Sequence, residues 1–329
     1  MLLTDAGRMV KKLEINEKVL SREELTGIAL RSLYYRHGYR QYRMSKFEEY
    51  DLYAHNKDFL VSDNIITFTD LNGRLLALKP DVTLSIVRSG RDEPGAVQKV
   101  YYNENVYRAG AGRSFKEIMQ VGVECIGDIN EGNISEVLQL AAESLQSISS
   151  ESILSISNLD IVSDLLDDLN VAGEDRADIL RSIGEKNPHG LARAAAAAGV
   201  GEDGIKKLSA LATTYGRPEE VLETVRGIVS DPSEMDPLVK AVEKLEELGY
   251  GGMLRIDFSV TGDLRYYNGI VFRGYVSGVA ESVITGGSYD RLMKKMGRSS
   301  RAIGFAVYLS ALEQLVPLTD ADRGGEENA

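Results

Sequence analysis

Two short groups of polar residues have the side chains best suited to holding a small charged ligand. In the first group, Gln120 and Glu124 lie on one face of an expected strand, residues 115–127, with Gly122 between them. Because side chains alternate along a strand, both point the same way, about 13 Å apart, over the bare backbone of Gly122. This spacing would leave a floor for a small polar ligand held at both ends. An ordinary solvent-facing strand is an equally good interpretation of these residues alone.

The second group is Asp81 and Thr83, in the sequence KPDVT. Pro80 ends an extended segment and Thr83 opens a short helix, so both side chains lie at a strand-to-helix junction. Residues at such positions usually only cap the helix. The functional alternative is a carboxylate and a hydroxyl offered to the ammonium group of a ligand.

The segments around these groups predict strands and hairpins. Residues 99–127 predict a hairpin with Gly110 and Gly112 in its loop, and residues 64–78 predict another that turns at Asn72-Gly73. Ser21 and Glu24 form a capping box ahead of a helix whose expected apolar face is Leu25, Ile28, Ala29 and Leu33.

The spacing of apolar residues changes along the chain. From residue 158 to 249 it is helical throughout, and strands return at 253–260, 266–276 and 281–285, followed by a helix at 290–296. A last helix is expected to carry Tyr308, Ala311, Leu312 and Leu315 on one side. We therefore predict a core in two parts, 1–157 and 250–318, interrupted by a helical insertion at 158–249, with a disordered tail at 319–329.

The composition restricts the classes of function. The chain has 329 residues and a formal net charge of −12, without a run of Lys or Arg that would attract a phosphate backbone. Its single cysteine, Cys125, and its three histidines show no metal-ligand spacing and no catalytic pairing. We expect no metal, no cofactor and no nucleic acid. Without a signal peptide or an apolar run long enough to span a membrane, we expect a cytoplasmic protein.

Several motifs together resemble the histidyl subgroup of the class II aminoacyl-tRNA synthetases. VYR, a glycine-bearing loop and FKEIMQVGVECIG resemble the motif 2 hairpin; GGSYDRL and AIGFAVYLSAL resemble the GGRYD signature and motif 3. LKPDVT resembles the family's RPEGT segment, DLRYYNGIVF its histidyl-specific tyrosine motif, and residues 36–53 its motif 1, although Ser45 replaces the motif proline. The resemblance implies an α+β fold with a mixed, mainly antiparallel sheet flanked by helices, and covers about 20–130 and 250–315.

The departures from the family pattern concern the nucleotide site. Arg108 matches the motif 2 arginine, but Gly110 replaces the following glutamate, Ala311 the motif 3 arginine and Gly262 the histidyl-specific arginine. Because fixed cationic donors stabilise the charge that develops on a phosphate, their loss should abolish adenylation. The sequence also stops where the family's anticodon-binding domain would begin.

The amino-acid pocket of the family is retained. The resemblance implies contacts to the α-amino group from Asp81, Thr83 and Gln120 and to the imidazole from Glu124 and Tyr267. The full set that we expect to bind histidine is Asp81, Thr83, Arg108, Gln120, Glu124, Tyr266, Tyr267, Gly287 and Tyr289, with no catalytic residue.

A synthetase-like body with a histidine pocket and no usable ATP site resembles the regulatory subunits of ATP phosphoribosyltransferase. That resemblance implies a short catalytic subunit as partner, feedback by histidine, and by analogy a homodimer through the motif 1 region. Two alternatives stay open: an enzyme that adenylates histidine, and a histidine-binding or scaffold protein without a phosphoribosyltransferase partner.

Overall fold

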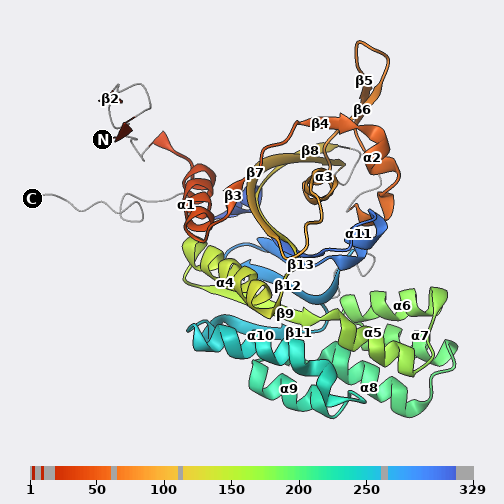
Figure 1. Ribbon diagram of the computed structural model, residues 1–329. Coiled ribbons are helices and arrows are strands. Elements are labelled where there is room, and N and C mark those ends of the chain that lie inside the picture. Colours follow the sequence, from red (N-terminus) through yellow and green to blue (C-terminus); the bar gives the residue numbers. More distant parts are fainter. Residues whose placement is uncertain are drawn as a thin grey trace, which may run out of the picture.

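The body of the protein is built on one large sheet (Figure 1). The computed structural model describes residues 2–3, 9–10, 19–60, 65–109, 114–260 and 266–315. Within these, nine strands pair in the order β10-β11-β9-β12-β13-β14-β8-β7-β3. Their bounds are β3 (Arg40–Gln41), β7 (Val97–Ala109), β8 (Phe115–Gly127), β9 (Ser152–Asn158), β10 (Tyr215–Gly216), β11 (Leu254–Asp257), β12 (Asn268–Val276), β13 (Ile284–Ser288) and β14 (Arg301–Tyr308).

The sheet is mixed and mainly antiparallel, as the sequence predicted. Only the β11–β9 and β3–β7 pairs are parallel. Strands β9 and β11, which flank the long helical segment, lie side by side in the sheet. The two parts of the predicted core therefore meet in one sheet, although about a hundred residues separate these two strands.

The two faces of the sheet carry different layers. Helices α1 (Arg22–Arg36) and α4 (Glu131–Ile148) pack against one face, in a core cluster that includes Val121, Val123 and Cys125 of β8. The opposite face carries a second cluster, which includes Val100 and Tyr102 of β7 together with residues of the short helices α3 (Thr83–Ser89) and α11 (Asp290–Lys295). The predicted capping box of Ser21 and Glu24 opens α1.

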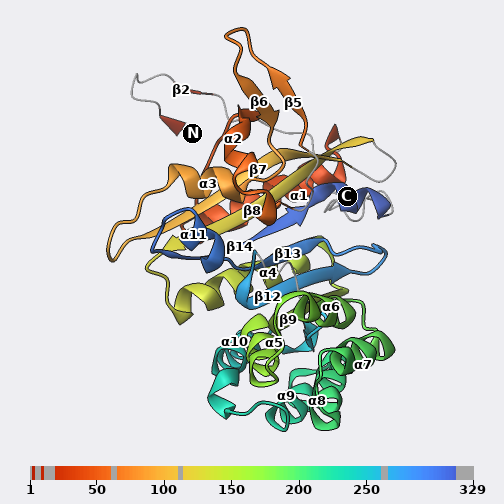
Figure 2. The same cartoon turned by 90° about the vertical axis from the view of Figure 1, so that its right-hand side faces the viewer.

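A small sheet extends from the second face (Figure 2). It consists of β4 (Phe47–Glu49), β6 (Leu75–Leu78) and β5 (Thr67–Thr69), and α2 (Tyr50–Ala54) follows β4 directly. Asp70 holds the predicted hairpin turn by accepting hydrogen bonds from the backbone N–H groups of Asn72 and Arg74, both at 2.8 Å. Near the N-terminus β1 (Leu2–Leu3) pairs with β2 (Met9–Val10).

The helical segment joins the main core. It contains α5 (Leu159–Asp168), α6 (Gly173–Gly184), α7 (Pro188–Ala197), α8 (Glu202–Thr213), α9 (Pro218–Arg226) and α10 (Asp236–Glu247). Nearly all of its buried hydrophobic residues belong to the same cluster as α1 and α4, and Leu159 of α5 packs instead with Val260 and Val271. The segment also supplies β10, an unpredicted two-residue strand that extends the sheet beside β11. Lys186 donates to Asp257 of β11 at 2.9 Å, which ties the segment to the sheet.

Two local predictions were wrong. Tyr308, which was expected on the last helix, ends the central strand β14, and in the part of the chain that the structure describes only a 3₁₀ turn, Leu309–Gln314, follows this strand. In α1 the buried residues are Gly27, Leu30, Leu33 and Tyr34, while Ile28 is 46% exposed. Most residues of β14 are buried, and a short apolar run of this kind does not distinguish strand from helix.

Candidate functional site

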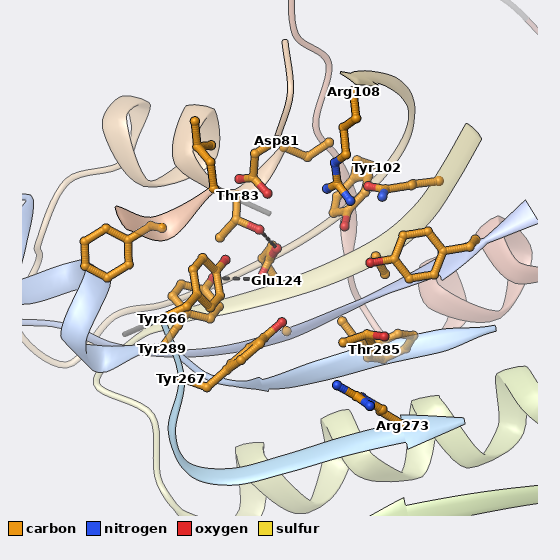
Figure 3. A pocket seen from close by; sticks show the side chains of 18 residues that line it. Asp81, Thr83, Tyr102, Arg108, Glu124, Tyr266, Tyr267, Arg273, Thr285 and Tyr289 are labelled. Atoms are coloured by element: carbon orange, nitrogen blue, oxygen red, sulfur yellow. Dashed lines mark hydrogen bonds between the residues drawn. The ribbon is translucent and has the colours of Figure 1, made fainter. Parts of the chain in front are cut away.

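A cavity of about 360 Å³ lies on the second face of the sheet, over strands β8, β14, β13 and β12 (Figure 3). The beginning of α3 and the tyrosine segment before β12 complete its walls. Its lining residues are Phe59, Leu60, Asp81, Val82, Thr83, Tyr102, Arg108, Gln120, Glu124, Tyr266, Tyr267, Arg273, Thr285, Tyr289, Gly304, Phe305, Ala306 and Tyr308. Both polar groups singled out in the sequence therefore meet in one space.

Glu124 is held in a fixed orientation at one end of this cavity. Thr83 donates to Oε1 of Glu124 at 2.7 Å, and the Tyr289 hydroxyl donates to Oε2 at 2.6 Å. Gly304 lies opposite Glu124 on β14, where a Cβ atom would come within 1.8 Å of Oε2. Gly304 leaves the space that the Glu124 carboxylate fills. The two hydroxyl groups fix the orientation of this carboxylate and therefore the direction of its remaining lone pairs.

Burial changes the proton affinity of both carboxyl groups in the cavity. Glu124 is 2% exposed, and this burial raises its pKa to about 8 against the opposing effect of the two hydroxyls. Burial also raises the pKa of Asp81, opposed by the Leu84 N–H bond and by the charge of Arg108. A ligand that brings positive charge or N–H donors would stabilise the ionised forms of both.

Asp81 caps α3, but Thr83 does not. Asp81 Oδ1 accepts from the backbone N–H of Leu84 at 2.9 Å, whereas the Thr83 hydroxyl turns to Glu124. Figure 3 shows the Asp81 carboxylate facing the cavity above Thr83. Asp81 therefore orders the start of the helix and also presents charge to the cavity.

Aromatic rings form the wall beside Glu124. Tyr266 packs against Tyr267 with ring centroids 4.5 Å apart, and against Tyr289 at 5.7 Å. Gly287 lies beneath this group, because a Cβ atom there would come within 2.9 Å of the Tyr267 ring. Gly287 thus supports the wall through backbone packing and does not itself line the cavity, unlike the other eight residues expected to bind histidine.

Gln120 and Arg108 reach the same space from the β7–β8 hairpin. The Gln120 side chain is buried, at 3% exposed, and makes no hydrogen bond to the described residues. Arg108 donates through Nε to the carbonyl of Pro80 at 3.0 Å, which leaves its two terminal nitrogens for other acceptors. The interpretation of β8 as a solvent-facing strand is therefore wrong.

The expected open floor at Gly122 is also wrong. In the hairpin register Tyr102 lies opposite Gly122, and a Cβ atom on Gly122 would come within 2.4 Å of the Tyr102 hydroxyl. The tyrosine occupies the space above the glycine, so a ligand would lie against an aromatic side chain rather than against bare backbone.

Four further polar residues of the cavity escaped the sequence reasoning: Tyr102, Arg273, Thr285 and Tyr308. The hairpin register could have indicated Tyr102, because its partner Gly122 had been singled out. The other three come from β12, β13 and β14, and only the strand order of the sheet places them here.

Comparison with known proteins identifies the family of this chain. The family model for histidyl-tRNA synthetase matches residues 14–312. The chain belongs to the histidyl-tRNA synthetase family. Among curated relatives, an ATP phosphoribosyltransferase regulatory subunit from Bacillus cereus (strain G9842) is 28% identical over 298 residues, covering 86% of this chain and 69% of the relative.

Solved structures of the family have the same fold. A protein from Bacillus halodurans, described as an ATP phosphoribosyltransferase regulatory subunit/histidyl-tRNA synthetase, is 28% identical with a TM-score of 0.79, covering 94% of this chain and 82% of that one. The histidyl-tRNA synthetase from Nostoc sp. PCC 7120 is 15% identical with a TM-score of 0.76, over 94% and 78% of the two chains. These matches confirm the class II synthetase-like fold and the resemblance to regulatory subunits that the motifs predicted.

The departures from the family pattern fall in different places. Ala311, at the position of the motif 3 arginine, packs against the hydrophobic core. Gly110 and Gly262, at the other two altered positions, lie outside the described residues. Among the described residues no group of three or more His, Cys, Asp or Glu side chains is arranged to hold a metal ion, and no helix is long and apolar enough to cross a membrane.

Proposed function

We propose that this chain is the regulatory subunit of an ATP phosphoribosyltransferase and serves histidine biosynthesis without catalysing a reaction of its own. The names of the curated relatives and of the Bacillus halodurans structure support this role. A structure titled ATP phosphoribosyl transferase (HisG:HisZ) complex from Thermotoga maritima, 18% identical, contains a chain of the same fold, with a TM-score of 0.70 over 88% of this chain and 97% of that one. The partner that we propose is a short-form catalytic subunit.

Free histidine is the ligand proposed for the cavity. The observation that carries this proposal is the buried Glu124 carboxylate, oriented by two hydroxyls and flanked by Tyr267, because a carboxylate accepts a charge-assisted bond from an imidazole N–H. The Asp81 carboxylate and the unpaired Gln120 amide suit the α-ammonium group. The remaining nitrogens of Arg108 suit a carboxylate.

Feedback follows if histidine binds one arrangement of the subunits better than another. The difference in affinity then shifts the hetero-oligomer towards the inhibited arrangement. A homodimer through the motif 1 region, residues 36–53, belongs to the same proposal, as does the absence of nucleic-acid binding in a chain with a formal charge of −12.

An adenylating enzyme is the second candidate, and the presence of Arg108 in the cavity favours it. Ala311 opposes it, because an apolar residue packed against the core offers no charge to a nucleotide. Histidine-dependent exchange of pyrophosphate into ATP decides between the two. We expect no exchange above background, and a clear signal would replace the regulatory role by an enzymatic one.

The subunit role is tested by assaying a candidate short-form catalytic subunit with and without this chain. We expect activity only when both are present, and inhibition by histidine that is lost in a Glu124→Gln complex. Activity that does not depend on this chain would refute the subunit role. Inhibition that is unchanged in the variant would refute only the feedback site proposed here.

A further inference from the structure

The cavity extends beyond the residues that we propose for the imidazole and the ammonium group. Arg273 of β12 pairs in register with Thr285 of β13, Thr285 with Ala306 of β14, and Ala306 with Gly122 of β8. At about 4.8 Å between neighbouring strands, Arg273 starts roughly 14 Å from the strand that carries Glu124. Figure 3 shows Arg273 and Arg108 on opposite sides of the cavity, with Thr285 nearer to Arg273.

Arg273 has no acceptor among the described residues. It is half-buried, yet no hydrogen bond or ion pair joins its guanidinium to the rest of the described chain. Two other shielded arginines do have acceptors: Arg298 donates to Asp92 at 2.8 Å and to the carbonyl of Val87, and Arg176 donates to Ser163. Arg31, outside the cavity, is half-buried like Arg273 and its Nε has no partner among the described residues. A guanidinium that lies in a cavity wall and has no acceptor of its own is available to an acceptor on a ligand, and this position points to one.

Two hydroxyl groups, one on the neighbouring strand and one on β14, line the cavity together with this guanidinium. Thr285 makes only one long contact, 3.5 Å from its Oγ1 to Oγ of Ser282, and the Tyr308 hydroxyl makes no hydrogen bond to the described residues. A planar guanidinium with neighbouring O–H donors is the usual means of holding a carboxylate or phosphate. At the other end of the cavity, Asp81 and Glu124 repel such an anion, so the charges separate two subsites.

We infer that Arg273, Thr285 and Tyr308 form an oxyanion subsite in the cavity, distinct from the imidazole and ammonium end. The inference rests on the proposed binding of histidine at Glu124. Two sources supply the same chemistry: the α-carboxylate of the bound amino acid, turned towards Arg273 rather than towards Arg108, or a separate phosphate group that binds beside it. A separate phosphate and the cationic groups of histidine stabilise each other's binding.

Calorimetric titration of the full chain with histidine, histamine and inorganic phosphate tests the subsite. Histamine lacks the carboxylate and so isolates its contribution. The variant is Arg273→Gln, and the matched control is Arg255→Gln on β11, whose guanidinium donates to backbone carbonyls outside the cavity. A thermal unfolding curve for each variant verifies that it is folded, and Arg273→Lys restores the charge without the planar fork.

Each result has a defined meaning. If the carboxylate is the source, Arg273→Gln weakens the binding of histidine at least about tenfold, which is the effect of one lost charge-assisted bond. The binding of histamine is then unchanged. If a separate anion is the source, the variant loses phosphate binding by a similar factor and leaves histidine unchanged when phosphate is absent. The inference is overturned if the variant matches the wild type for all three probes, or if Arg255→Gln has the same effect.

Failure of the proposed function is recognised separately. If the wild type binds no histidine but binds phosphate through Arg273, the histidine proposal fails and the subsite stands. If histidine binding depends on Glu124 but Arg273→Gln changes the binding of no probe, the histidine proposal stands and the subsite fails.

Discussion

Replacing Glu124 by Gln should weaken histidine binding without unfolding the cavity. The amide has nearly the same shape, and it can still pair with both hydroxyls because its oxygen accepts from one and its nitrogen donates to the other. What is lost is one charge-assisted hydrogen bond to the imidazole. Such a bond contributes about 1.5–3 kcal/mol, so the dissociation constant should rise roughly 10- to 150-fold.

The pH dependence gives a sharper form of this prediction. The empty protein has a Glu124 pKa of about 8, and free imidazole has a pKa of about 6.5. The complex that we predict pairs an imidazolium with the carboxylate and so holds one proton between the two groups. Below pH about 6.5 both partners are protonated, so binding must release a proton; above about 8 both are deprotonated, so binding must take one up. Wild-type affinity should therefore peak between these values.

The assay is calorimetry in buffers of different ionisation enthalpy from pH 5.5 to 9.5, which reports affinity and proton exchange together. In Glu124→Gln the part of this pH dependence that comes from Glu124 should disappear, while the part that comes from Asp81 and from the ammonium group of histidine should remain. Glu136→Gln, which removes the partner of Lys99 outside the cavity, is the control and should behave as the wild type. Equal affinities of Glu124→Gln and the wild type throughout this range would refute the reasoning.

Three further predictions concern the same carboxylate. Gly304→Ala should abolish histidine binding and destabilise the fold by about 1–3 kcal/mol, because its Cβ would come within 1.8 Å of Oε2 of Glu124. Gly252→Ala, with open space around residue 252, is the control and should have neither effect. Calorimetry measures the binding and chemical denaturation the stability, and a Gly304→Ala protein that binds histidine normally would contradict the geometry. Wild-type stability should fall relative to Glu124→Gln as the pH rises, because the folded pKa lies above the ordinary 4.5: the contribution is complete below pH 4.5 and is lost through about 8. The same difference in unfolding free energy between the wild type and Glu124→Gln at pH 5 and at pH 9 would contradict this prediction. Tyr289→Phe removes a donor that lowers the Glu124 pKa, so the decline in affinity should move to higher pH in the same titration; a shift to lower pH would count against the proposed orientation.

The local parts of the site could be predicted because short-range rules fix them. Alternation along β8 places Gln120 and Glu124 on one face, and a proline followed by a helix start places Asp81 and Thr83 at a junction. Which partner each side chain takes was not predictable in this way. Thr83 turns to Glu124 rather than to its own helix, because strand and helix are brought together across 41 positions of sequence.

The remainder depends on strand order. Arg273 and Tyr308 enter the cavity only because β12 and β14 are neighbours of β13 in the sheet, an arrangement that local periodicity does not contain. The same limit explains the error at β14, where a short and mostly buried apolar run has the composition of a buried strand or of a helix. It also explains α1, whose buried stripe is set by the position of α4 and β7 and centres on Leu30 rather than on Ile28.

The most direct test of the account is a crystal structure of the chain grown with histidine. We predict density for one histidine whose imidazole lies within hydrogen-bond distance of Glu124 beside Tyr267, with its ammonium group towards Asp81 and Gln120. An empty cavity at saturating histidine, or a nucleotide in a reactive position beside Arg108, would contradict the account.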